Sequence, residues 1–303
     1  MQIKNLRISR SNLVHSFTIL LVFSSLNKLA EAKIRDFQTT RMKSTAGAGV
    51  ATFLVDEASI LNPAPIAFSG KSSFYFQKGS SEAQGPNKDS GPNATPTDNM
   101  AIIASDGNGT LKGSLSYVKQ TKGDETRMRI SSAVSSLTGK QSAMGFGYRY
   151  TKLESPKGNE NYKQLTAGVY HYVSPSLSMG LVVFDPLKER PEDVKVFAGF
   201  QYSVGNYLTL MFDGGADYTQ NLSSTTVIKA ATELKIFSDF YARAGYFEDK
   251  GLKQKGTGAG IGWVQPKLVL EFAIKNTEIT ASEELEQENE QIKESSFSLS
   301  YRF

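Results

Sequence analysis

Apolar and polar residues alternate along most of this chain, in stretches of about ten residues separated by breaks rich in turn-forming residues. The final stretch, SSFSLSYRF, shows the pattern most clearly, with aromatic or leucine side chains at every second position and serine or arginine between them. A period of two is that of a β-strand, whose successive side chains point to opposite faces. The pattern predicts fourteen strands, at residues 66–78, 98–105, 110–121, 125–136, 143–154, 162–173, 177–184, 194–203, 207–219, 225–237, 240–249, 256–264, 267–277 and 295–303.

The connections between these predicted strands alternate in length along most of the chain. Long polar connections such as 79–97, 155–161 and 278–294 alternate with tight turns such as Val264-Gln265-Pro266-Lys267, and the short connection 122–124 is an exception. Tight turns at one end of a barrel and longer loops at the other are typical of bacterial outer-membrane barrels, whose short turns face the periplasm. We therefore expect the short turns and the N-terminus on the periplasmic side.

The alternation alone leaves open which face of the sheet is buried. A soluble barrel points its apolar side chains inward, whereas a membrane barrel points them toward lipid and keeps charges inside. Three features favour the membrane barrel: an export signal, fourteen strands of which most have the ~9–11 residues needed to cross hydrocarbon, and the aromatic C-terminal residue Phe303. The sequence therefore predicts an all-β transmembrane antiparallel barrel surrounded by outer-membrane lipid.

The first 32 residues are organised like a secretory signal peptide. Lys4, Arg7 and Arg10 precede the apolar run FTILLVF, and small residues lead to Ala30-Glu31-Ala32. The apolar run is much shorter than the ~20 residues of a membrane-spanning helix. We expect cleavage after Ala32.

Composition narrows the classes of function. The chain carries a formal net charge of +4, and most of this excess lies in the predicted signal peptide, so the remainder lacks the basic stripe of a nucleic-acid-binding protein. It contains no cysteine, which excludes disulfides and thiolate metal sites. We predict no nucleic-acid partner, no cofactor and no metal site.

Residues that could support catalysis are scarce. Beyond the predicted signal peptide the chain has one histidine, His171, and it contains no P-loop, H-E-x-x-H or G-x-S-x-G motif. His171 lies near the end of a predicted strand. It is more simply interpreted as a residue at the membrane interface than as the base of a hydrolase. The sequence therefore does not predict an enzyme.

Residues 33–65 do not alternate and carry a short helical pattern around Asp56 to Leu61. Asp56 and Glu57 suit the first turn of a helix, near its partially positive N-terminus. Pro63 ends the pattern, because its ring lacks an amide donor and clashes with the preceding turn.

An ordered set of short motifs in this segment resembles the N-terminal signature of FadL-type and PorV-like outer-membrane barrels. The motifs are Gly47-Ala48-Gly49-Val50-Ala51, Asp56-Glu57-Ala58-Ser59 and Asn62-Pro63-Ala64, and the stretches FYARAGYFEDKG and GAGIGW resemble late strands of PorV-like members. The resemblance implies a barrel of about fourteen strands with a short helical plug in its lumen. It divides the chain into a signal peptide at 1–32, a plug segment at 33–65 and a barrel at 66–303, with plug residues Gly47, Gly49, Asp56, Glu57, Ser59, Asn62, Pro63 and Ala64.

The side chains expected to face the lumen include more bases than acids, together with several aromatic residues. The basic residues fit either ion pairs that hold the plug or an interior that meets an anionic headgroup. The aromatic residues fit either an apolar ligand pocket or packing against the plug, and inward glycines leave room for a plug close to the wall. The candidate lumen or ligand residues are Arg127, Arg129, Arg149, Lys195, Phe197, Met211, Tyr241, Arg243 and Phe247.

Two functions follow from these features. The first is an outer-membrane channel or transporter for small hydrophobic or amphipathic molecules, fatty-acid-like as the FadL-type resemblance implies. The second is a non-transporting docking or structural protein of the outer membrane, as the PorV-like resemblance implies. The sequence identifies no protein partner.

Overall fold

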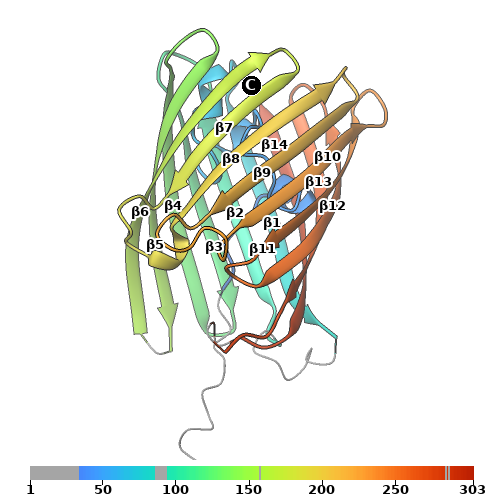
Figure 1. Ribbon diagram of the computed structural model, residues 1–303. Coiled ribbons are helices and arrows are strands. Elements are labelled where there is room, and N and C mark those ends of the chain that lie inside the picture. The colour runs from blue at the N-terminus through green and yellow to red at the C-terminus, as the bar shows by residue number, and fades with distance from the viewer. Residues whose placement is uncertain (1–33, 86–93, 157, 284, 286) are drawn as a thin grey trace, which may run out of the picture.

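The computed structural model describes residues 34–85, 94–156, 158–283, 285 and 287–303. In these residues fourteen strands form one closed antiparallel barrel around the segment that precedes the first strand (Figure 1). The strands are β1 (Ser73–Gln84), β2 (Thr97–Asp106), β3 (Lys112–Lys122), β4 (Glu125–Leu137), β5 (Ser142–Ser155), β6 (Gly158–Ser174), β7 (Leu177–Phe184), β8 (Lys195–Val204), β9 (Leu208–Ala216), β10 (Val227–Lys235), β11 (Phe240–Asp249), β12 (Gln254–Val264), β13 (Leu268–Ile279) and β14 (Glu290–Arg302).

Helical structure is confined to short elements. They are α2 (Thr40–Ser44) and the 3-10 helices η1 (Val55–Glu57), η2 (Ala64–Phe68) and η3 (Pro191–Asp193). None of the helices in the described ranges is long and apolar enough to cross a membrane. The predicted signal peptide, residues 1–32, lies outside the described residues.

Each strand pairs with its neighbours in sequence, and β1 closes the barrel against β14. All fourteen predicted strands are present, and three of them, β1, β6 and β14, begin four or more residues away from the expected position. β1 begins at Ser73 because the residues before it form η2 and a short irregular stretch. β14 begins at Glu290, since residues 79–84 of β1 pair with residues 291–296, so the prediction of a connection up to residue 294 is wrong.

The two ends of the barrel differ in their connections. One end, called the short-turn end below, carries the connections 107–111, 138–141, 175–176, 205–207, 236–239 and 265–267. The other, called the long-loop end, carries the connections 85–96, 123–124, 156–157, 185–194, 217–226, 250–253 and 280–289. The predicted long connection at 155–161 is wrong, because β5 and β6 extend past the barrel wall as a tight hairpin (Figure 1).

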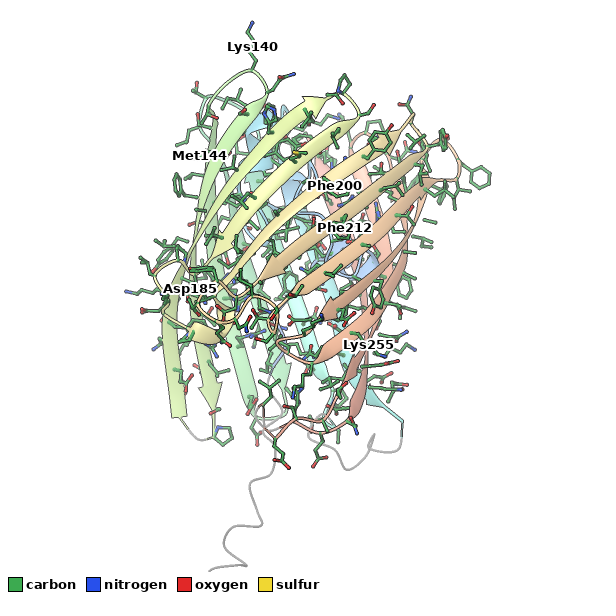
Figure 2. All side chains as sticks on the ribbon, viewed as in Figure 1. Lys140, Met144, Asp185, Phe200, Phe212 and Lys255 are labelled. Carbon is green, nitrogen blue, oxygen red and sulfur yellow. The ribbon has the colours of Figure 1, made fainter. Side chains whose placement is uncertain are left out.

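The two faces of the wall have opposite chemistry. Phe212 is 39% exposed on the outside, while the next residue, Asp213, is fully buried in the lumen. Phe200 and Phe212 stack on the outer surface, with ring centroids 5.5 Å apart (Figure 2). Such a surface suits lipid, which accepts apolar side chains and excludes unpaired charges. The predicted transmembrane barrel, with apolar side chains outside and charges within, is confirmed.

The segment before β1, residues 34–72, fills the lumen and is called the plug below. At the long-loop end, Arg35 donates from Nη2 to Gln254 Oε1 at 3.0 Å and accepts at its carbonyl oxygen from Gln120 Nε2 at 3.0 Å. At the short-turn end, the Ser72 amide donates to the carbonyl oxygen of Phe303 at 2.9 Å. The plug therefore crosses the whole lumen, and the described N-terminal end lies opposite the short turns, not on their side as predicted.

Candidate functional site

The helix α2 begins the part of the plug that packs against the wall. Thr39 caps it, because its Oγ1 accepts from the Met42 amide at 3.1 Å while its hydroxyl donates to Glu57 Oε1 at 2.6 Å. All five residues of the helix are buried, and it packs against β11 to β14. This helix was not predicted, since residues 40–44 carry too few apolar positions for a helical pattern.

Glycines on the inner face of the wall make this close packing possible. A Cβ atom at Gly258 of β12 would overlap the carbonyl oxygen of Lys43, and one at Gly260 would lie 2.6 Å from Ser44 Cβ. A Cβ atom at Gly245 of β11 would overlap the backbone of Thr45. The expectation that inward glycines leave room for the plug is therefore met at the site of α2.

A substitution at Gly258 should unseat the plug. Gly258→Val forces a side chain against the backbone of the plug. We expect this to lower the stability of the seated plug by about 3 kcal/mol, in the upper part of the range for overpacked sites. Limited trypsin digestion of the folded protein tests whether the plug has left its seat, because trypsin would cut at Arg41 or Lys43 once they are exposed. Gly214→Val is the matched control, because a Cβ atom there meets nothing within 4 Å. Equal protease resistance of the two variants would contradict the prediction.

The glycines Gly47 and Gly49 form a turn that clamps onto a wall carboxylate. Their φ angles are +84° and +143°, which residues with a side chain rarely adopt. In this conformation the amides of Gly49 and Val50 both donate to Asp213 Oδ2 of β9, at 2.7 and 3.1 Å. The G-x-G motif thus joins the plug to the wall.

The Asn62-Pro63-Ala64 motif fixes the plug against strands β5 and β6. Asn62 donates from Nδ2 to the carbonyl oxygen of Val50 at 2.8 Å and accepts at Oδ1 from the Ala64 amide at 3.1 Å. Inward glycines again make room, because a Cβ atom at Gly145 would lie 2.6 Å from the Pro63 backbone. The predicted helix around Asp56 to Leu61 is reduced to the 3-10 helix η1 and the turn that follows it.

The acidic residues of the plug are buried near the short-turn end. Asp56 accepts hydrogen bonds from Ser73 at 2.6 Å and Ser300 at 3.1 Å, and it lies 3.8 Å from Arg302. Burial raises the pKa of the Asp56 carboxyl above its ordinary value, and the hydrogen bond from Ser73 and the charge of Arg302 oppose that rise. Burial likewise raises the pKa of Glu57, against the nearby charge of Arg41.

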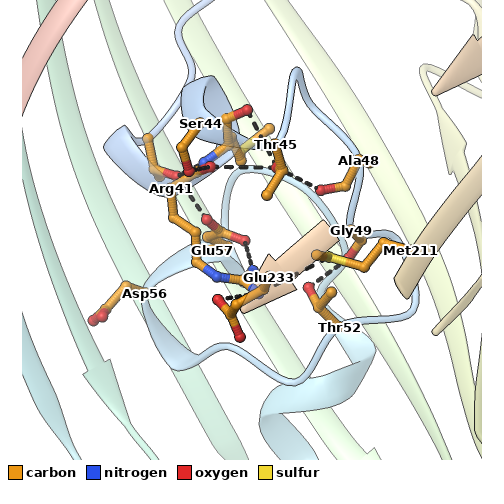
Figure 3. Close-up of polar contacts among 12 residues, drawn as sticks. Arg41, Ser44, Thr45, Ala48, Gly49, Thr52, Asp56, Glu57, Met211 and Glu233 are labelled. Atoms are coloured by element: carbon orange, nitrogen blue, oxygen red, sulfur yellow. Dashed lines mark hydrogen bonds and ion pairs between the residues drawn. The ribbon is translucent and has the colours of Figure 1, made fainter. Parts of the chain in front are cut away.

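An alternating cluster of charges connects α2 to the wall toward the short-turn end (Figure 3). Arg41 lies 3.8 Å from Glu57 in the plug and 3.4 Å from Glu233 on β10. Glu233 also pairs with Arg243 of β11 at 2.5 Å, and Arg243 pairs with Glu271 of β13 at 2.8 Å. This cluster supports the interpretation in which the inward basic residues hold the plug.

A second cluster involves a residue that the sequence pattern missed. Lys43 of α2 lies 3.7 Å from Glu294 of β14, which also approaches Lys275 and Arg35 at 4.0 Å. Burial lowers the pKa of Lys43, and the charge of Glu294 opposes that effect. Glu294 was placed in a loop because the acidic stretch before it hides the alternation. The pairing partner Ser81 on β1 shows that it belongs to the strand.

The candidate ligand residues fall into two groups. Phe197, Met211, Arg243 and Phe247 are buried in contact with the plug or with other wall residues, as are Arg127 and Arg129, which lie 3.6 and 3.1 Å from Asp36 of the plug. Arg149, Lys195 and Tyr241 are half-buried on the lumen wall. Lys195 pairs with Asp249 at 2.7 Å, and the ring of Tyr241 lies 5.8 Å from Lys235 Nζ.

Comparison with known proteins identifies the fold. No protein-family model and no curated protein sequence matches the chain. The solved structure of the Ralstonia pickettii toluene transporter TbuX matches with a TM-score of 0.65 at 10% identity, over 91% of this chain and 98% of that chain. The chain shares its fold with this transporter. The Pseudomonas putida toluene transporter TodX matches with a TM-score of 0.64 at 9% identity, over 90% and 99% of the two chains.

A structure from within the resembled family matches as well. A Pseudomonas aeruginosa FadL homologue matches with a TM-score of 0.58 at 12% identity, over 89% of this chain and 99% of that chain. The FadL-type resemblance of the N-terminal motifs is thus confirmed for the fold. In this barrel, the predicted plug residues Gly47, Gly49, Asp56, Glu57, Ser59, Asn62, Pro63 and Ala64 all lie in the segment that fills the lumen.

Proposed function

We propose that this chain is an outer-membrane channel that transports small hydrophobic or amphipathic molecules. The proposal is supported by the fold shared with two toluene transporters and a FadL homologue, and by the apolar exterior of the barrel. The same features support a location in the outer membrane with the short turns toward the periplasm. In that orientation the plug begins on the outer side and ends on the periplasmic side.

The observation that carries the proposal is a half-buried aromatic and basic surface on the lumen wall toward the long-loop end. Arg149, Phe184 and Lys195 are all half-buried. The guanidinium carbon of Arg149 lies 6.0 Å from the ring centroid of Phe184, which packs edge-on against Phe197 at 6.2 Å. An amphipathic molecule could place its apolar part on these rings and its polar end at Arg149 or Lys195.

Transport in this arrangement requires the plug to move. The cavity between the plug and strands β1, β13 and β14 measures about 20 Å³ and is lined by side chains such as Arg41, Glu57 and Glu271. A space of this size holds about one water molecule and no hydrocarbon. Solute could therefore pass this point only after part of the plug had left its seat.

The test is uptake into proteoliposomes, with labelled toluene and a labelled long-chain fatty acid. We expect uptake of at least one of them above protein-free vesicles. Arg149→Met should lower uptake of the fatty acid and leave toluene uptake unchanged, because only the carboxylate interacts with the guanidinium. Lys163→Met, on an exposed outward position of β6, is the control. Protein that takes up neither compound would reject the proposal.

One observation favours the second candidate, a docking or structural protein. The plug is joined to the wall by ion pairs through Arg41, Lys43 and Asp56. A segment that must be readily displaced for transport would be expected to make fewer such contacts. This alternative predicts no uptake, and affinity capture from solubilised membranes should then recover a stoichiometric protein partner. Capture without such a partner would count against it.

A further inference from the structure

Toward the long-loop end, the outward face of most strands carries a charged side chain. These residues are named the charged collar below. The collar lies beyond the apolar belt of the barrel, where strands leave hydrocarbon and meet the lipid headgroups. Its members are Lys78, Asp98, Lys119, Lys152, Lys163, Glu248, Lys255, Glu278 and Lys293, on strands β1, β2, β3, β5, β6, β11, β12, β13 and β14.

The collar is interrupted over four neighbouring strands, β7 to β10. Their last outward residues toward the long-loop end include Val183, Val196 and Ile228, and Thr232 is the polar exception among the outward positions of these strands. The strands are also short, with 8, 10, 9 and 9 residues, against 14 and 17 in β5 and β6. The rim is therefore low here, and Figure 1 shows the β5–β6 hairpin extending well beyond the β7–β8 connection.

Two loops stand on this low part of the rim, at residues 185–194 and 217–226. They are joined by a hydrogen bond of 3.4 Å from Tyr218 Oη to the carbonyl oxygen of Asp185. The Asp185 carboxylate is buried and accepts from the Arg190 amide at 2.7 Å, which holds the first loop folded. Each loop nevertheless exposes a leucine, Leu187 at 71% and Leu222 at 58%.

We propose that these two loops lie in the lipid interface of the leaflet on the long-loop side, with Leu187 and Leu222 in contact with acyl chains. The occupant of this surface is lipid because the exposed leucines continue an apolar belt that lipid already covers, with no charged collar between. Tyr218 also suits the lipid interface, since its ring is apolar and its hydroxyl is polar. The proposal rests on the transmembrane barrel and is independent of transport.

The proposal gives the barrel one side on which apolar solutes dissolved in the membrane meet the loops directly. On the other strands, β4 excepted, such a solute would have to pass a charged collar residue to reach the rim. Behind the β7–β8 loop lie the rings of Phe184 and Phe197 on the lumen wall. The uncollared sector therefore lies on the strands whose inner face carries the surface proposed above for ligands.

Tryptophan fluorescence can test the depth of the two loops. The chain contains one tryptophan, Trp263, on the outward row of β12 near the short-turn end. Leu187→Trp and Leu222→Trp, each combined with Trp263→Phe, place a single reporter in either loop. In phosphatidylcholine vesicles whose acyl chains carry bromine, we expect both reporters to lose fluorescence and to emit at shorter wavelength than in water.

A matched control reports on a loop that stands above the collar. Asp124→Trp with Trp263→Phe places the reporter in the tight β3–β4 turn at the same end, where we expect no quenching. The unaltered protein, with Trp263 in the belt, should be quenched and shows that the barrel is inserted. Unquenched reporters at both 187 and 222, or quenching at 124 equal to theirs, would overturn the proposal. A protein partner on this surface would give the first of these results, and neither result would change the uptake assay.

Discussion

A Ser59→Cys/Ser114→Cys double variant, once oxidised, is expected to take up no hydrophobic solute and to recover uptake when reduced. Ser59 lies in the plug and Ser114 on β3, and their Oγ atoms are 3.3 Å apart, so two sulfur atoms could join with a small adjustment. The protein has no other cysteine to compete. The bond would tie the plug to the wall, and transport that needs plug displacement would stop. Uptake into proteoliposomes before and after dithiothreitol measures the effect.

The chain offers a closely matched control for this experiment. Ser80 of β1 and Ser295 of β14 also have their Oγ atoms 3.3 Å apart, and both belong to the wall. Oxidised Ser80→Cys/Ser295→Cys protein should therefore transport as the unaltered protein does. If the plug-locked variant transported equally well, solute would pass without displacement of the part of the plug at Ser59. If neither variant nor the unaltered protein transported, the docking alternative would gain support.

Loss of Arg243 should be the most destabilising single change in the lumen. Arg243→Met removes the partner of Glu233 and Glu271, and breaking a buried ion pair in this way typically costs about 3–5 kcal/mol. The side chain of Arg243 is 4% exposed, so solvent cannot replace the guanidinium. The free energy of unfolding in urea, measured for protein inserted in vesicles, should fall by this amount.

Two further variants test whether the loss of stability comes from buried charges left without a partner. Lys255→Met breaks an ion pair of 3.2 Å with Glu278 that is more than half exposed, and it should change the stability little. The triple variant Arg243→Met/Glu233→Gln/Glu271→Gln should recover much of the loss, because no buried charge is then left unpaired. If Arg243→Met were no less stable than Lys255→Met, the charge cluster around Arg243 would not be what stabilises this part of the barrel.

The plug shows which features the local sequence pattern could not predict. The motifs around Gly47, Asn62 and Asp56 predicted a plug only through a resemblance, because nothing in their spacing says that they enter a barrel. The Asp213 carboxylate that binds Gly49 is 164 residues away in sequence, and no periodicity connects the two. The helix α2 was missed because its packing depends on wall glycines and on Glu294, which its own sequence does not reveal.

The candidate ligand residues also show what the alternation of apolar and polar positions cannot predict. Alternation correctly placed Arg149, Lys195 and Arg243 on the inner face of the wall. It could not distinguish Arg243, which the wall acids Glu233 and Glu271 neutralise, from Arg149, which remains half-buried beside Phe184. That difference depends on which carboxylates of other strands the closed barrel places beside each base.

The sequence by itself determined the strands, their order around the barrel and the inversion of its faces. These follow from a period of two, short connections between neighbours, and the chemistry of lipid, all of which act locally along the chain. Only the tertiary structure decided where the plug enters, which charges it neutralises and which side of the rim lacks a charged collar. Such features arise when distant residues share one lumen, and the depth of each strand end is fixed by the stagger of all fourteen strands together.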